Sequence, residues 1–252
     1  MNALDRPPPN PLQVHPASNA AELAAQLALH AAQRLREAIG ARGHAVLAVS
    51  GGKSPVAMFE RLREQPVEWD HVSVLLVDER CVPHDHPESN TALVRTHLLQ
   101  GAAAAARFVP FFDRLPTVLD DAALAALADG ANHRLATQPW PMDLAVLGMG
   151  EDGHTASIFP GAPGLARALH GSGPVTWQRP AEASRAPHAR LTLTLPALLA
   201  TRELALSISG ASKLAVYQQA RLAADESLPV SLVLNQHLTP VSVWLACTRH
   251  PK

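Results

Sequence analysis

The stretch that most constrains the fold of this chain is residues 143–161, Asp-Leu-Ala-Val-Leu-Gly-Met-Gly-Glu-Asp-Gly-His-Thr-Ala-Ser-Ile-Phe-Pro-Gly. Its apolar run, residues 144–147, predicts a short strand buried on both faces. Glycines at positions 148, 150 and 153 follow at once, and glycine lets the backbone turn tightly and bring amides close to a ligand. Thr155 is expected to cap a short helix that Pro160 ends. The pattern places His154 at the carboxyl edge of a sheet.

The same stretch also spells the G-x-G-x-x-G fingerprint of dinucleotide-binding folds. That fingerprint requires a long helix after the glycines and an acidic residue about 20 positions further on. Pro160 stops any helix soon after the loop, and residues 158–176 contain no Asp or Glu. The sequence therefore argues against a nicotinamide or flavin site, and we expect no cofactor.

Other apolar segments predict further strands, separated by segments with the apolar period of a helix. One helix is expected to start at a cap on Ser18 or Asn19 and to end at Gly40 or Gly43. Strand–helix alternation without an internal repeat indicates the α/β class, with a single doubly wound, mostly parallel sheet and helices on both faces. Strands are expected at 45–49, 72–77, 144–147, 190–195 (half-buried), 204–208 and 241–245.

The domain organisation follows from length and proline content. With 252 residues, the chain is long enough for one large α/β domain. Residues 1–17 contain five prolines, which predicts a flexible leader without regular structure. We expect residues 18–252 to form a single catalytic domain.

Charge and cysteine content exclude several classes of partner. The formal net charge is -1 at pH 7, with acidic and basic residues interspersed, so there is no electrostatic case for binding nucleic acid or an anionic membrane. Two cysteines are too few for a disulfide framework and fit a reducing compartment. The sequence shows no signal peptide and no membrane-spanning apolar run. We expect a cytoplasmic protein, a monomer or a small homo-oligomer.

Two glycine turns carry signals for an anion. Residues 50–55, Ser-Gly-Gly-Lys-Ser-Pro, lie between a predicted strand and a helix, where a turn cradles anions. A nucleotide P-loop would need glycine at Leu47, and the nucleophile elbow of an esterase follows several strands, not the first. Ser50 is therefore favoured as a turn residue that bonds nearby amides. Lys213, in the first turn of a predicted helix after Gly210, opposes the helix dipole unless an anion is present.

Polar residues also follow the predicted strand at 72–77, at positions where open α/β sheets bind ligands. They begin with Asp78, Glu79 and Arg80. The next potential metal ligands match no established zinc spacing, so we predict no metal. These are Cys81, His84, Asp85, His86 and Glu88.

Four blocks together resemble the 6-phosphogluconolactonase family, within the wider group of sugar-phosphate isomerase and deaminase-like folds. The match runs from about Ala45 to Leu245, and the third block is the specific one. The blocks are Ser50-Gly51-Gly52 with Pro55, Val77-Asp78-Glu79-Arg80 followed by Ser89-Asn90, residues 147–161 around His154, and Gly210 with Lys213. The resemblance implies hydrolysis of 6-phospho-D-glucono-1,5-lactone to 6-phospho-D-gluconate in the oxidative branch of the pentose phosphate pathway, with this sugar phosphate as the partner.

The resemblance implies that His154 is the base and that Asp78, Arg80 and Lys213 are further site residues. The chemistry of lactone hydrolysis suggests the following roles as a hypothesis. His154 would take a proton from water and return it to the ring oxygen, help that is worth about 10² to 10⁴ in rate. Asp152 would orient the loop, Arg80 and loop amides would stabilise the oxyanion, and Asp78 would hold Arg80 or a sugar hydroxyl. The expected catalytic residues are His154, Asp152, Asp78 and Arg80. The expected substrate-binding residues are Ser50, Gly51, Gly52, Asn90, Gly150, Gly153, Arg190 and Lys213, with Arg190 the weaker candidate for the phosphate.

Two alternatives remain open at this stage. Sugar-6-phosphate deaminases share the Asp-Gly-His loop but end it in Asn-Glu-Pro-Gly, whereas this chain has Ile-Phe-Pro-Gly at residues 158–161, without the carboxylate. A sugar-phosphate sensor that binds without turnover is the other alternative, and the chain carries no DNA-binding segment that would favour it. The sequence departs from the resembled pattern at His188-Ala189, where prolines are expected, and at Ala246-Cys247, where an aspartate is expected.

Overall fold

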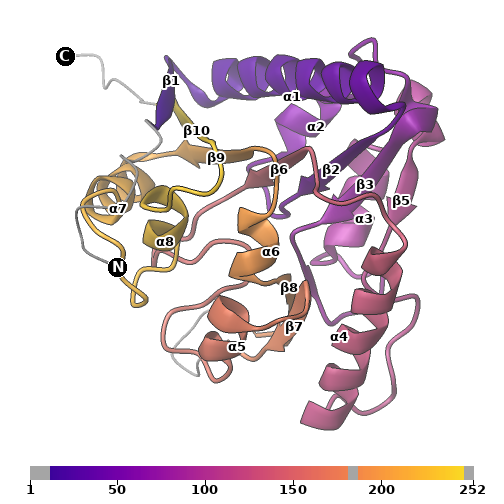
Figure 1. The fold of residues 1–252 in the computed structure, drawn as a ribbon, viewed down its shortest axis with the longest axis vertical. Coiled ribbons are helices and arrows are strands. Elements are labelled where there is room, and N and C mark those ends of the chain that lie inside the picture. Colours follow the sequence, from indigo (N-terminus) through magenta and orange to yellow (C-terminus); the bar gives the residue numbers. More distant parts are fainter. Residues whose placement is uncertain (1–11, 181–186, 247–252) are drawn as a thin grey trace.

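The computed structural model describes residues 12–180 and 187–246 and shows an α/β architecture around one main sheet (Figure 1). Seven strands form this sheet in the order β1-β10-β9-β6-β2-β3-β5, and every neighbouring pair is parallel. Strands β2 and β6 are buried at every position because their residues are all apolar. The strands are β1 (Gln13–Ala17), β2 (Ala45–Val49), β3 (Val72–Leu76), β5 (Arg107–Val109), β6 (Leu144–Leu147), β9 (Leu204–Ser209) and β10 (Val241–Ala246).

The order of the strands reverses between β2 and β6. After β2 the chain adds β3 and β5 on one side, and it then crosses to add β6, β9 and β10 on the other. In a doubly wound sheet, loops at the carboxyl ends of the strands diverge at such a point and leave a crevice where ligands bind. The fold predicted from the sequence is confirmed, and its topology directs attention to the loops after β2 and β6.

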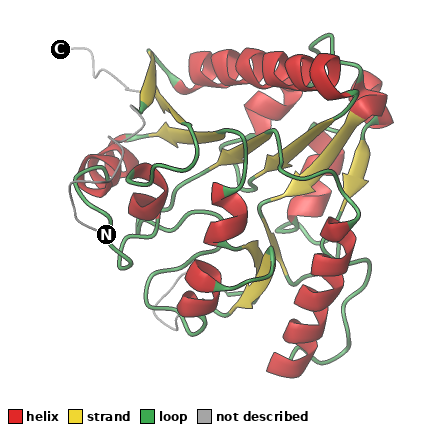
Figure 2. Cartoon of the chain, in the orientation of Figure 1, coloured by secondary structure: helices red, strands yellow, loops and turns green. Residues whose placement is uncertain are grey.

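Helices cover both sides of the main sheet (Figure 2). Helix α1 runs along one side, where Asn19 caps its start and Gly43, in the left-handed conformation, ends it. Helices α6, α7 and α8 lie on the other side in the view of Figure 1. The helices are α1 (Ala20–Arg42), α2 (Val56–Leu62), α3 (Asn90–His97), α4 (Asp121–Ala136), α5 (Leu165–His170), α6 (Leu195–Leu199), α7 (Ala211–Ala220) and α8 (Val230–Leu234), with short 3₁₀ turns at Trp69–His71 and Gly101–Ala105.

A second, three-stranded sheet is the main feature that the sequence analysis does not predict. Strands β4 (Asp78–Arg80) and β7 (Val175–Gln178) flank β8 (Arg190–Leu193), and both pairings are antiparallel. The prediction of a half-buried strand over residues 190–195 is wrong in two respects. All four residues of β8 are buried, and the strand ends at Leu193 because Thr194 caps α6. Hydrophobic periodicity reveals a strand but not its partner, so a separate sheet cannot be recognised from it.

Part of the expected leader forms a strand. Residues Gln13–Ala17 form β1, which pairs with β10 from Gln13 opposite Ser242 to Ala17 opposite Ala246. Pro16 is tolerated there because β1 is an edge strand, where a missing N–H can face away from the sheet. The ordered domain therefore begins before residue 18, while residues 1–11 of the predicted leader lie outside the described part.

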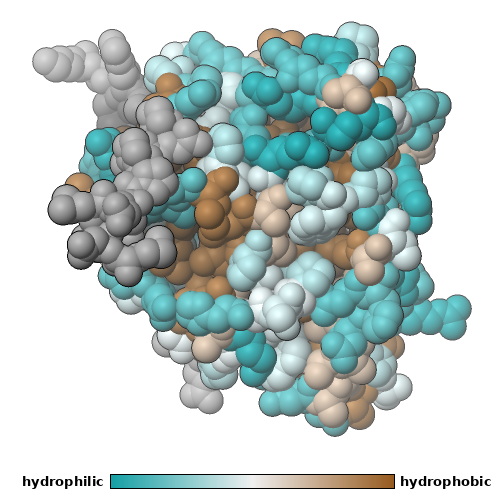
Figure 3. Space-filling model, viewed as in Figure 1, coloured by the Kyte–Doolittle hydropathy of each residue, from teal (hydrophilic) through white to brown (hydrophobic). Residues whose placement is uncertain are grey.

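The surface of the described part is mostly polar in the view of Figure 3, with hydrophobic colour gathered left of centre. Large exposed apolar side chains are spread over several elements, including Val14 on β1 and Leu29 on α1. Single residues of this kind are normal on folded proteins. Among the described helices, none combines the length and the apolar character that crossing a membrane requires.

Candidate active site

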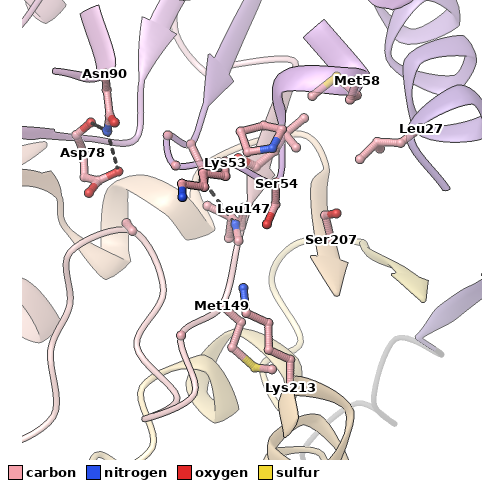
Figure 4. Close-up of a pocket in the computed structure, with 18 of the residues that line it drawn as sticks. Leu27, Lys53, Ser54, Met58, Asp78, Asn90, Leu147, Met149, Ser207 and Lys213 are labelled. Atoms are coloured by element: carbon pink, nitrogen blue, oxygen red, sulfur yellow. Dashed lines mark hydrogen bonds between the residues drawn. The ribbon is translucent and has the colours of Figure 1, made fainter. Parts of the chain in front are cut away.

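A cavity of about 270 Å³ opens at the reversal point of the main sheet, where the loops after β2 and β6 diverge. Figure 4 shows its wall divided by chemistry, with Asp78 and Asn90 on one side and the apolar side chains of Leu27 and Met58 on the other. Nine residues predicted for the site line this cavity. They are Ser50, Gly51, Gly52, Asp78, Arg80, Asn90, Gly150, His154 and Lys213.

The loop after β6 presents His154 together with Asp152. Nδ1 of His154 lies 2.6 Å from Oδ1 of Asp152, and the same oxygen accepts from the main-chain N–H of His154 at 3.2 Å. The His154 side chain is 31% exposed. Because Nδ1 is held by the carboxylate, Nε2 is the ring nitrogen left to act on a ligand.

The carboxylate of Asp152 stays ionised in this setting. Burial alone would raise the pKa of Asp152, but hydrogen bonds from the side chain and main chain of His154 outweigh burial and lower it. An ionised carboxylate at Nδ1 fixes the ring orientation and stabilises an imidazolium. Asp152 touches the ring and is not part of the cavity wall, so the geometry matches a residue that orients His154.

Gly150 and Gly153 are needed in this loop for different structural reasons. A Cβ at Gly150 would stand 2.2 Å from Nδ1 of His154 and 2.4 Å from Oδ1 of Asp152, so only glycine leaves room for the pair. Gly153 adopts a positive φ of 79°, and its carbonyl accepts from the N–H of Val230 at 2.9 Å. Gly153 therefore anchors the loop to α8 and does not line the cavity.

The short helix predicted after this loop is absent from the described residues 155–161. Thr155 donates its hydroxyl to the carbonyl of Gly148 at 2.9 Å and forms a bridge with Ile158, so the chain folds back on itself. Ala156 has a φ of 49°, which a right-handed helix cannot contain. The prediction that Thr155 caps a helix is wrong because its side chain closes the loop behind it.

Ser50 joins the loops after β2 and β6. Its hydroxyl donates to the carbonyl of Val146 at 2.9 Å and accepts from the N–H of Gly148 at 3.1 Å. A hydroxyl held by two main-chain groups is poorly placed to be a nucleophile, which needs a base beside it. Ser50 thus matches the turn residue favoured by the sequence analysis and not the nucleophile of an esterase.

Asp78 and Asn90 are buried beside the glycine turn after β2. Nδ2 of Asn90 donates to the carbonyl of Asp78 at 2.8 Å, and Oδ2 of Asp78 accepts from the hydroxyl of Ser157 at 2.5 Å. A Cβ at Gly51 would stand 1.7 Å from Oδ1 of Asn90, so this turn packs directly against the asparagine. Asp78 therefore connects the elements on both sides of the cavity.

Arg80 and Arg190 are directly opposite each other on the neighbouring strands β4 and β8 of the small sheet. The guanidinium of Arg80 donates to the carbonyl of Glu88, while its Nε is buried without a partner among the described residues. Arg190 is 6% exposed and does not line the cavity; its Nε and Nη1 are also without described partners. Burial lowers the pKa of Arg190 and nearby Asp78 raises it, but the guanidinium remains charged. Arg190 is thus buried beside Arg80, outside the residues that line the cavity.

Lys53 and Lys213 approach the cavity from opposite sides in Figure 4, from the turn after β2 and from the first turn of α7. They are two of only three lysines in the chain. With Arg80 they give the wall three cations against the single carboxylate of Asp78. The sequence analysis identifies Lys213 but passes over Lys53, whose position directly after Gly52 is the available signal.

Glu79 is a further residue of the site region, and the sequence analysis names it without assigning a role to it. Its side chain is fully buried and accepts from the N–H groups of Arg80, Asn90 and Thr91 at 2.7–2.8 Å and from the hydroxyl of Ser89 at 3.2 Å. The carboxylate therefore fixes the start of α3, and with it Asn90, to β4. Alternation within β4 points Glu79 away from the face that carries Asp78 and Arg80.

Comparison with known proteins gives consistent similarities. The family described as glucosamine-6-phosphate isomerases/6-phosphogluconolactonase matches residues 18–244. A 6-phosphogluconolactonase of Pseudomonas aeruginosa is 46% identical over 222 residues, which cover 88% of this chain and 90% of the relative. One of Neisseria meningitidis serogroup B is 42% identical over 232 residues, covering 92% and 98%. The crystal structure of a 6-phosphogluconolactonase from Shewanella baltica superposes with a TM-score of 0.87 at 38% identity, covering 94% of this chain and 98% of that one.

Proposed function

The chain belongs to the glucosamine-6-phosphate isomerase/6-phosphogluconolactonase family, and on that basis we propose that it hydrolyses 6-phospho-D-glucono-1,5-lactone to 6-phospho-D-gluconate. The observation that carries the proposal is the Asp152–His154 pair beside a cavity lined by three cations and one carboxylate. A lactone is an ester, and its hydrolysis needs a base for water and a proton donor for the leaving oxygen. The substrate also carries a phosphate, and binding this phosphate requires cations at a fixed distance from the base.

Nε2 of His154 acts as the base in this proposal. It takes a proton from water while the water oxygen bonds to the lactone carbonyl carbon, and the carbonyl oxygen becomes an oxyanion. The tetrahedral intermediate then re-forms the carbonyl and breaks the bond to the ring oxygen, which receives the proton from His154. The Asp152 carboxylate stabilises the imidazolium between the two steps.

The oxyanion and the sugar are held by groups on the opposite wall. Arg80 lines the cavity, and a donor well placed for an oxyanion is worth about 3 kcal/mol. Asp78 can accept from a sugar hydroxyl while it remains bonded to Ser157. Arg190 contributes positive charge from its place beside Arg80 and does not touch the substrate in this assignment.

The phosphate is placed between the glycine turn after β2 and Lys213, with Lys53 at the entrance. Lys213 is half-buried, whereas Lys53 is exposed, so Lys213 has the less hydrated amine and the stronger interaction with a phosphate. A substrate fixed at its phosphate holds its carbonyl near His154, which removes much of the entropic cost of the encounter.

The deaminase alternative is less favoured because of Phe159. Its ring lies against the ring of His154, with the centroids 4.7 Å apart. The deaminase pattern places a carboxylate at this position in the sequence, and a phenyl ring cannot accept or donate a proton. The side of His154 that faces Phe159 thus suits lactone hydrolysis. It does not suit the deaminase reaction, whose ring opening needs proton transfers.

The direct test measures proton release after the addition of freshly prepared 6-phosphogluconolactone, corrected for spontaneous hydrolysis. Glucosamine 6-phosphate and a simple ester serve as comparison substrates. We expect acceleration for the lactone alone. Release of ammonia from glucosamine 6-phosphate would favour the deaminase, and tight binding of 6-phosphogluconate without any acceleration would favour a sensor.

A further inference from the structure

We propose that His86, Glu88 and His188 form a binding site for a divalent transition-metal ion, with Zn²⁺ as the best match. One ligand atom from each residue lies within 4.8 Å of the ligand atoms of the other two. The three residues lie in the segment between β4 and α3 and just before β8, and none of them lines the cavity that contains His154. The absence of a metal predicted from the sequence is revised by this proposal, because His188 lies 100 residues from Glu88 along the chain.

The two segments are held together independently of any metal. The N–H of Cys81 donates to the carbonyl of Ala189 at 2.8 Å, which continues the pairing of β4 with β8 by one residue. The N–H of Ser89 donates to the carbonyl of His86 at 2.9 Å and closes a turn around Glu88. A metal would therefore meet ligands that are already near one another, and it would not have to order a flexible loop.

The ligand side chains already contact each other. Nε2 of His188 lies 2.7 Å from Oε2 of Glu88, and the rings of His86 and His188 are nearly perpendicular, with their centroids 5.5 Å apart. Nδ1 of His86 accepts from the N–H of Glu88 at 3.1 Å, so an electron pair of this ring points into the turn. The side chains of His188 and Glu88 are 29% and 48% exposed, which leaves the cluster open to an ion from solvent.

The donor set decides which ion fits. Two imidazoles and one carboxylate are a common set for zinc, and imidazole also suits Ni²⁺, Cu²⁺ and Co²⁺ better than Mg²⁺ or Ca²⁺. At bond lengths of about 2.0–2.1 Å, the ligand atoms of a tetrahedral zinc ion stand roughly 3.4 Å apart. The ligand atoms here lie within 4.8 Å of one another, so no pair has to close by more than about 1.4 Å. Water from solvent completes the coordination.

The expected affinity is moderate. The Arg80 guanidinium donates to the main-chain carbonyl of Glu88, so a positive charge lies near the proposed ion and opposes it. Metal binding must also break the contact between His188 and Glu88, so these two ligands are not without a partner beforehand. We expect dissociation constants on the order of micromolar and not those of structural zinc sites, whose ions are essential for folding.

The test is isothermal titration of the full, untagged chain with Zn²⁺ at neutral pH after treatment with a chelator. We expect one strong equivalent, and visible absorption typical of low-coordinate Co²⁺ when Co²⁺ is used instead. The variants His188→Ala and His86→Ala should each weaken Zn²⁺ binding at least tenfold, whereas Mg²⁺ should not bind measurably. Glu88→Gln provides a variant of nearly equal size if a histidine variant fails to fold.

The matched control is His133→Ala, which removes a histidine from the exposed side of α4, where its ring bonds only the carbonyl of Asp129 among the described residues. This variant should bind Zn²⁺ like the unchanged chain. The proposal is overturned if the double variant of His86 and His188 retains the strong equivalent, or if His133→Ala loses as much affinity as His188→Ala. In either case the His188–Glu88 contact is a hydrogen bond that joins two segments and nothing more.

Discussion

Oδ1 of Asp152 receives two hydrogen bonds from His154, one from the ring at 2.6 Å and one from the main chain at 3.2 Å. The two residues are therefore one unit, in which the carboxylate sets both the ring orientation and the position of the residue that carries it. Asp152→Asn should lower kcat roughly 10²-fold with little change in KM, because the amide cannot stabilise an imidazolium. The measurement is steady-state hydrolysis of 6-phosphogluconolactone beside His154→Ala.

The matched control for Asp152→Asn is Glu151→Gln. Glu151 is an exposed acid on the same loop, so this variant removes the same charge one residue away. We expect kcat to remain within a few-fold of the unchanged chain. Equal losses in the two variants would assign the effect to loop charge and would contradict the pairing described here.

Gly150→Ala tests the close approach of the loop to this pair. The added Cβ would stand 2.2 Å from Nδ1 of His154, so the ring must move. Misplacing a catalytic group by about 1 Å costs on the order of 10²-fold in rate, and we expect a loss of kcat of this size. Gly130→Ala, on the exposed side of α4 with free space at its Cβ, should leave kcat unchanged. Full activity of Gly150→Ala would show that the loop relaxes at no cost.

Lys213→Ala is expected to raise KM roughly 10- to 100-fold while kcat changes little, since a charged hydrogen bond contributes about 1.5–3 kcal/mol. Lys53→Ala should raise KM less, because Lys53 is exposed and Lys213 is half-buried. The measurement is KM for the lactone together with inhibition by inorganic phosphate. A fall in kcat as large as that of His154→Ala would remove Lys213 from the phosphate site.

Glu203 gives a pH-dependent contribution to stability away from the cavity. Burial alone would raise its pKa, but hydrogen bonds from His30 and Ser242 and the charge of Arg34 lower it below the ordinary value of 4.5. A carboxyl group whose pKa is lowered by folding stabilises the native state above pH 4.5, and this contribution is lost as the pH falls through the native pKa.

Glu203→Gln should therefore reduce the free energy of unfolding at neutral pH by roughly 1–3 kcal/mol and make its decline in acid shallower. Calorimetric melting between neutral pH and pH 3 measures both effects. Glu37→Gln is the control, because Glu37 pairs with the same Arg34 but has a side chain that is 48% exposed. Parallel melting curves for Glu203→Gln and the unchanged chain would contradict the prediction.

Local patterns account for what the sequence predicts well. The apolar residues 144–147 and the glycines after them determine a buried strand and a tight turn without reference to distant residues. The position of His154 at the carboxyl end of a central strand is therefore confirmed. Asn19 and Gly43 likewise bound α1 through contacts within a few residues.

Contacts between distant segments account for what the sequence does not show. The pairing of β4 with β8 joins Asp78 to Thr192, and nothing near either residue reveals the other. Glu79 holds the start of α3, and this role is recognisable only when the N–H groups of Asn90 and Thr91 are seen to donate to it. The reversal of the chain at Thr155 depends on a hydrogen bond to the carbonyl of Gly148. Hydrophobic periodicity does not reveal such a bond.

The reversal of strand order between β2 and β6 has a consequence for biogenesis. The Ser50 turn emerges early during synthesis, while Lys213 and the strand before it, β9, emerge only near the end. A nascent chain can complete the first wall of the cavity long before the second exists. The phosphate site that we propose is therefore completed only after β9 and the start of α7 have been made.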